Sequence, residues 1–166
     1  MRRLILSLMV VAAPAMAQST LVAGARANFT EGHNYIARAA EQLPESLYAW
    51  RPIAGVRSFA EQFGHVAGSE VSTCATVLGD AAKEENAIEK TAKTKAALIA
   101  ALQESARYCE RAYALTDAQA AQPIKLYGRD RSKMYALVEN ATHDWEHYGN
   151  LVTYLRLKGL IPPSSQ

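Results

Sequence analysis

Apolar side chains recur at helical spacing in four stretches of the chain. These stretches run from about residue 21 to 43, 58 to 79, 94 to 115 and 132 to 158. Proline or glycine stands at the end of the first, second and fourth, as expected where a helix ends. The pattern therefore predicts an all-α domain, a four-helix bundle, because a bundle buries all four apolar faces.

The second helix has the clearest start signal. Ser58 can accept a hydrogen bond from the free backbone N–H groups of the first turn, and Glu61 stands three residues later. This is the spacing of a capping box. We expect the helix to begin directly after Ser58 and to end near Gly79.

The connection between the second and third helices is long. Residues 80 to 94 are rich in Lys and Glu and show no apolar period, so we expect a solvated connection without regular structure. Extended at ~3.3 Å per residue, it can return along a helix of ~30 Å. A long crossover between helices 2 and 3 therefore allows these two helices to run parallel. Pro123 and Gly128 mark the next connection as a loop.

The two cysteines are Cys74 and Cys109, on the second and third predicted helices. If these helices are parallel neighbours, both cysteines lie at similar heights in the bundle, which favours a disulfide. The alternative is two small, buried apolar side chains.

Charge and composition narrow the function classes. The 166 residues carry 18 Lys and Arg against 16 Asp and Glu, a formal net charge of +2. This balance gives no electrostatic basis for nucleic-acid binding, so we expect no nucleic-acid partner.

The first residues have the pattern of a secretory signal peptide. A basic start is followed by an apolar run of about ten residues and by the small-residue sequence Ala15-Met16-Ala17. A retained membrane anchor is the weaker alternative, because a bilayer span needs ~20 apolar residues. We therefore expect residues 1–17 to be removed and residues 18–166 to form a periplasmic or secreted domain that does not associate with a membrane.

Two histidines on the fourth helix suggest metal chemistry. His143 and His147 are four residues apart, so both imidazoles lie on one helix face and can bind one metal ion. Two unrelated surface histidines are the alternative. A zinc protease is disfavoured, because its motif needs a glutamate where Asp144 stands. Glu139, Asp144 and Asn150 are candidates for orienting the imidazoles.

The remaining histidines have weaker signals. His65 lies on the polar edge of its helix, so periodicity predicts exposure. His33 lies near the stripe of Phe29 and Ile36, where we expect a hydrogen-bonded core histidine; the alternative is a fourth metal ligand or a group that supports the ligands. Arg51, Arg57 and Arg156 are candidate anion-binding groups or ordinary solvated surface.

Two long strings resemble the DinB-like family of proteins. One is Tyr48-Ala49-Trp50-Arg51-Pro52 followed by Val56-Arg57-Ser58-Phe59-Ala60-Glu61-Gln62-Phe63-Gly64-His65. The other begins His143-Asp144-Trp145-Glu146-His147 and ends with Arg156, Gly159 and Pro162-Pro163. The resemblance implies a bundle in up-down-down-up order and a divalent metal ion held by His65, His143 and His147. Zinc or nickel is the expected metal ion.

Characterised members that the chain resembles include thiol-dependent transferases and isomerases. The first hypothesis is therefore an exported metal-dependent transferase or hydrolase acting on an unknown small molecule. The second is a non-catalytic exported bundle that binds metal or a small ligand, or forms a homodimer. The sequence assigns neither a catalytic residue nor an organic cofactor, so whether the protein is an enzyme stays open.

Overall fold

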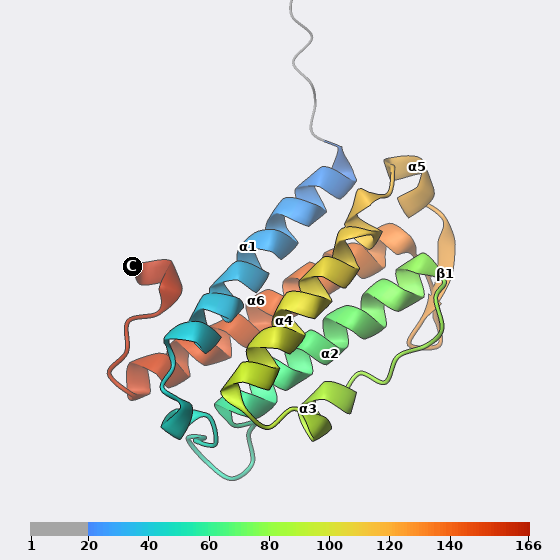
Figure 1. Cartoon of the computed structure of the whole chain (residues 1–166). Coiled ribbons are helices and arrows are strands. Elements are labelled where there is room, and N and C mark those ends of the chain that lie inside the picture. The colour runs from blue at the N-terminus through green and yellow to red at the C-terminus, as the bar shows by residue number, and fades with distance from the viewer. Residues whose placement is uncertain (1–19) are drawn as a thin grey trace, which may run out of the picture.

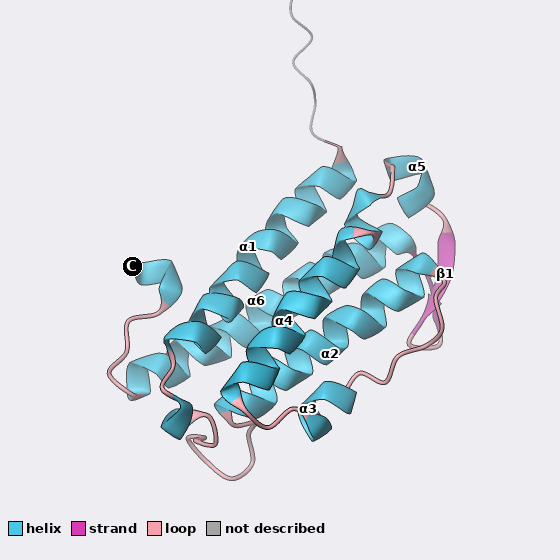
Figure 2. Ribbon diagram, in the orientation of Figure 1, coloured by secondary structure: helices cyan, strands magenta, loops and turns pink. Residues whose placement is uncertain are grey.

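The computed structural model describes residues 20–166, and the expected signal peptide lies outside them. The long helices are α1 (Leu21–Gln42), α2 (Phe59–Leu78), α4 (Lys95–Glu110) and α6 (Lys133–Leu157); the short ones are α3 (Ala87–Thr91) and α5 (Asp117–Ala120). The strands β1 (Pro123–Leu126) and β2 (Arg129–Ser132) form a hairpin, and 3-10 turns cover Glu45–Leu47, Ala112–Ala114 and Pro163–Ser165. Figure 2 shows that helices dominate the molecule, which confirms the all-α prediction.

The four long helices lie side by side. Helix α1 packs along α6, and α2 packs along both α4 and α6. In Figure 1, α2 and α4 run in the same direction, opposite to α1 and α6. A disulfide joins Cys74 on α2 to Cys109 on α4, whose Cα atoms are 5.4 Å apart. Within residues 20–166, no helix combines the length and the apolar character needed to span a bilayer.

Local signals fix the ends of α2 and α6. Ser58 and Glu61 form the predicted capping box, in which each side chain accepts a hydrogen bond from the other residue's backbone N–H. Gly79 ends α2 in the left-handed conformation, with φ of 76°. Ser132 caps the start of α6, and Gly159 follows its end with φ of 72°. These boundaries agree with those predicted from the sequence.

The crossover from α2 to α4 is not the irregular, solvated connection that its composition suggested. It contains α3 and packs along α2, as Figure 1 shows. The close approach depends on two glycines of α2. A Cβ atom on Gly68 would lie 1.9 Å from the carbonyl oxygen of Glu85, and one on Gly64 would lie 2.7 Å from the Cα atom of Glu89.

The connection before α6 also differs from the expected loop. It contains α5 and the hairpin, whose two-residue turn places Tyr127 and Gly128 at positive φ angles of 47° and 74°. Such turns match the twist of the paired strands. The third long helix also ends earlier than the periodicity indicated, at Glu110, where a 3-10 turn takes over.

Replacing Gly68 with alanine is expected to push the crossover away from α2. The new methyl group would meet backbone, which cannot rotate aside, so we expect a loss of about 1–3 kcal/mol in the free energy of unfolding. Gly149→Ala is the matched control on α6, because a Cβ atom there meets nothing within 4 Å. Urea unfolding should show a lower midpoint for Gly68→Ala and an equal or higher one for Gly149→Ala; equal midpoints for Gly68→Ala and the unmodified protein would refute the contact.

Candidate metal centre

Three imidazoles from two helices meet at one point. His65 comes from the first half of α2, and His143 and His147 come from successive turns of α6. The Nε2 atom of His143 lies 3.2 Å from that of His65 and 3.1 Å from that of His147. The expectation that His65 is exposed is wrong, since it is buried with only 6% of its surface exposed. The structure therefore brings all three predicted ligands together.

The spacing of the three Nε2 atoms fits a divalent metal ion. Two imidazole nitrogens bound at ~2.1 Å to one ion, at tetrahedral or octahedral angles, lie ~3.0–3.4 Å apart. Both of the short distances from His143 fall in that interval. An all-imidazole donor set suits zinc, nickel, iron or copper, so the ligands alone do not select the metal.

A hydrogen bond to Gln62 orients His147 so that its other ring nitrogen, Nε2, faces this centre. The Nδ1 atom of His147 lies 2.5 Å from the side-chain oxygen of Gln62, a residue that is 4% exposed. An amide oxygen only accepts hydrogen bonds, so Nδ1 carries the proton. The Nε2 lone pair is then available as a metal ligand, held in place by Gln62.

Gln62 gives a test of this orientation. We expect Gln62→Leu to weaken metal binding about 10- to 100-fold, the usual cost of losing a group that orients a metal-bound histidine. Gln62→Glu is the matched variant, because its carboxylate still accepts from Nδ1 and should keep the affinity. Competition with a coloured chelator measures both, and equal affinities for Gln62→Leu and the unmodified protein would contradict the role.

His65 is oriented by the crossover and by the loop before α2. Its Nδ1 atom lies 3.1 Å from the side-chain oxygen of Asn86 and 3.6 Å from a carboxylate oxygen of Glu89. The guanidinium of Arg57 is also 3.1 Å away, but it is already paired with Glu89 at 3.1 Å. Because two acceptors, Asn86 and Glu89, and only one donor, Arg57, surround Nδ1 of His65, this nitrogen is expected to carry the proton. The Nε2 lone pair of His65 is then free to bind a metal ion.

The three candidates for orienting the imidazoles form no hydrogen bond with them. Within residues 20–166, neither Glu139, Asp144 nor Asn150 forms a hydrogen bond with His65, His143 or His147. The Nδ1 atom of His143 is buried and has no hydrogen-bond partner among residues 20–166. Asp144 lies in the bundle core instead, where it is fully buried. Sequence reasoning missed Gln62 and Asn86, which do contact the imidazoles.

Burial keeps two of the imidazoles neutral. Desolvation, followed by the electrostatic effects of His143, His65 and Arg57, lowers the pKa of His147 to about 3. Desolvation, followed by His65, also lowers the pKa of His143. A metal ligand must be unprotonated, so both side chains are in the required state at neutral pH.

The depressed pKa of His147 predicts a pH effect on the metal-free protein. An unfolded histidine titrates near pH 6.5, so this group stabilises the fold above that pH, and the contribution is lost as the pH falls toward 3. We expect the melting temperature of the metal-free protein to fall more steeply between pH 7 and pH 4 than that of His147→Gln, which cannot titrate there. Parallel curves would contradict the shift.

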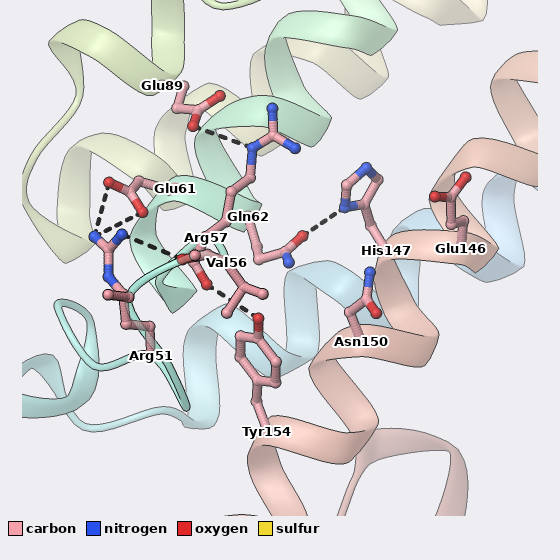
Figure 3. Close-up of a pocket in the computed structure, with 12 residues that line it drawn as sticks. Arg51, Val56, Arg57, Glu61, Gln62, Glu89, Glu146, His147, Asn150 and Tyr154 are labelled. Atoms are coloured by element: carbon pink, nitrogen blue, oxygen red, sulfur yellow. Dashed lines mark hydrogen bonds and ion pairs between the residues drawn. The ribbon is translucent and has the colours of Figure 1, made fainter.

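A cleft of about 590 Å³ opens beside the three histidines. Figure 3 shows His147 on one wall, next to Glu146 and Asn150 of α6. The opposite wall carries Arg57 and Gln62. His147 therefore belongs to both the cleft and the histidine cluster.

Two predicted anion-binding residues line this cleft, each held by a carboxylate. Arg51 pairs with Glu61 at 2.9 Å, and Arg57 pairs with Glu89 at 3.1 Å. Tyr154 donates a hydrogen bond of 3.1 Å to the backbone carbonyl of Arg57. The third candidate, Arg156, is not among the lining residues. The ion pairs hold both guanidinium groups at the cleft wall.

Comparison with known proteins identifies the family. The sequence profile of the DinB superfamily matches residues 28–151. The fold is similar to that of a DinB-like protein (YjoA) from Bacillus subtilis, with a TM-score of 0.60, 20% identity, and coverage of 82% of this chain and 92% of that chain. No curated protein matches at a significant level. Because the matched residues include most of the bundle and all three histidines, the chain belongs to the DinB superfamily.

Proposed function

We propose that this protein is an exported metalloprotein in which His65, His143 and His147 hold one divalent ion, zinc or nickel, and that it catalyses a transferase or hydrolase reaction on a small polar molecule. The observation that carries the proposal is the convergence of three Nε2 atoms beside a cleft of about 590 Å³. Three protein ligands leave a coordination position open, as in catalytic rather than structural sites.

The chain's own residues have separable roles in this proposal. His65, His143 and His147 would hold a divalent ion, which would supply the activation of a water or a thiol as a nucleophile at neutral pH. Gln62 and Asn86 keep the lone pairs of His147 and His65 directed at the ion. Arg57 lies at the cleft wall, where its guanidinium can orient an anionic group of the substrate.

Export is supported by two independent features. Residues 1–17 have the pattern of a signal peptide, and the disulfide between Cys74 and Cys109 is the kind of bond that persists in oxidising compartments. We therefore place the protein in the periplasm or outside the cell. A substrate found there is required, which disfavours the cytosolic small thiols used by characterised relatives.

Elemental mass spectrometry of untagged protein, beside His65→Ala and His147→Ala, tests the site. We expect each variant to lose about one ion per chain relative to the unmodified protein. Thr142→Ala is the control, because Thr142 is an exposed residue of α6 next to His143. Unchanged metal content in the two histidine variants would refute the site.

Activity is tested separately. A panel of ester, phosphoester and thiol-transfer reactions should show turnover with the unmodified protein and none with His65→Ala. Metal binding without turnover on any of these reactions would favour the non-catalytic alternative, a bundle that binds metal or a small ligand.

A further inference from the structure

A polar layer interrupts the apolar core of the bundle. One apolar half includes Phe63 and Leu151, and the other includes Phe29 and Leu137. Between the halves, each long helix contributes a buried polar side chain: His33 from α1, Glu70 from α2, Ser105 from α4 and Asp144 from α6. The layer therefore crosses the whole core, at a place where apolar side chains would pack at no cost in desolvation.

Two carboxylates of this layer are completely buried. Glu70 and Asp144 have exposed fractions of 0%. Glu70 contacts Nδ1 of His33 at 2.8 Å with one oxygen and accepts from the hydroxyl of Ser105 with the other. Both oxygens of Asp144 are buried without a hydrogen-bond partner among residues 20–166. Among these residues, Asp144 therefore has no hydrogen-bond donor beside it as a carboxylate, and a second acidic group, Glu70, lies close to it.

With both carboxylates ionised, His33 alone cannot balance the charge of this cluster. Within residues 20–166, no lysine or arginine forms an ion pair with Glu70 or Asp144, and His33 is the one basic group in contact with Glu70. Burial of an unpaired carboxylate is strongly unfavourable. A divalent cation would balance both carboxylates and leave His33 neutral.

We propose that His33, Glu70 and Asp144 form a second site for a divalent cation, inside the bundle core and separate from the three-histidine centre. One ligand atom from each side chain lies within 4.8 Å of the others. One imidazole with two carboxylates is a donor set that suits zinc, manganese or iron. Ser105 would hold the Glu70 carboxylate in place from behind.

The site is separate from the first one but can be reached from the surface. Asp144 follows His143 directly, and successive residues of a helix point ~100° apart, so one faces the core while the other faces the histidine cluster. A small cleft of about 200 Å³ is lined by His33 together with Thr30, Ala106 and Tyr113. This cleft between α1 and α4 gives a cation an entry route that bypasses the three histidines.

Zinc counting in variants tests the proposal. The full-length, untagged protein is stripped of metal, loaded with Zn²⁺, passed over a chelating resin and measured by elemental mass spectrometry. We expect about two zinc ions per chain in the unmodified protein and about one in either His65→Ala or Glu70→Gln. The double variant, which combines His65→Ala with Glu70→Gln, should bind none. Circular dichroism confirms that each variant folds, and Asp144→Asn replaces Glu70→Gln if that variant does not fold.

Each possible result is decisive. About one ion in the unmodified protein and none in His65→Ala would overturn the second site while supporting the first. Two ions retained in both Glu70→Gln and Asp144→Asn would also overturn it, because the extra ion would then lie elsewhere. One ion retained in His65→Ala but lost in the double variant supports the core site, whatever reaction the protein catalyses.

Discussion

Replacing His143 with alanine should weaken the binding of one divalent ion about 10²- to 10³-fold. Binding of zinc by a complete set of ligands is worth about 10–16 kcal/mol, so one ligand contributes a few kcal/mol. His143 is the central member of the cluster, because its Nε2 atom is the one close to both other histidines. Titration with Zn²⁺ against a coloured chelator measures the loss.

Two controls separate this effect from damage to the helix. Alanine is a better helix former than histidine, so α6 should remain intact, and circular dichroism should be unchanged. Thr142→Ala should bind Zn²⁺ like the unmodified protein. The account fails if His143→Ala binds with full affinity.

Removal of the disulfide should have the largest effect on stability. The bond between Cys74 and Cys109 closes a loop with a sequence separation of 35 residues. In the chain-entropy treatment, a loop of this size stabilises the fold by about 4 kcal/mol. The double variant Cys74→Ala with Cys109→Ala should lose about that much free energy of unfolding, measured with guanidinium chloride.

Reductant provides the matched control for the disulfide. Reduction of the unmodified protein should lower its unfolding midpoint to near that of the double variant, whereas the double variant itself should not respond. A midpoint that is the same with and without the two cysteines would show that the disulfide does not contribute to stability.

Helix positions were predictable because their signals are local. Apolar periodicity located the four long helices, and the pair of Ser58 and Glu61 located the start of α2. Gly79 and Gly159 marked helix ends, since each adopts a positive φ angle that favours glycine. Such signals depend only on neighbours in the sequence.

The crossover was not predictable in the same way, because its structure depends on contacts between distant residues. Residues 80–94 have no apolar period of their own, yet their backbone rests on Gly64 and Gly68. The same contact covers the polar edge of α2, which buries His65. Periodicity assigns burial from apolar character, so it assigned this edge to solvent.

The candidate site was predictable in part. The spacing of His143 and His147 and the family resemblance indicated the three histidines, and the structure brings them together. The groups that orient the imidazoles were not identified, because Asp144, a candidate for this role, lies in the core. His143, the preceding residue, faces the histidine cluster instead. Which of the two side chains faces the core depends on how α1, α2 and α6 pack together.

The most direct test of the metal centre is anomalous X-ray scattering from crystals of the zinc-loaded protein. We expect an anomalous peak ~2.0–2.1 Å from the Nε2 atoms of His65, His143 and His147. Absence of a peak among these three atoms, in crystals that contain zinc elsewhere, would contradict the central claim.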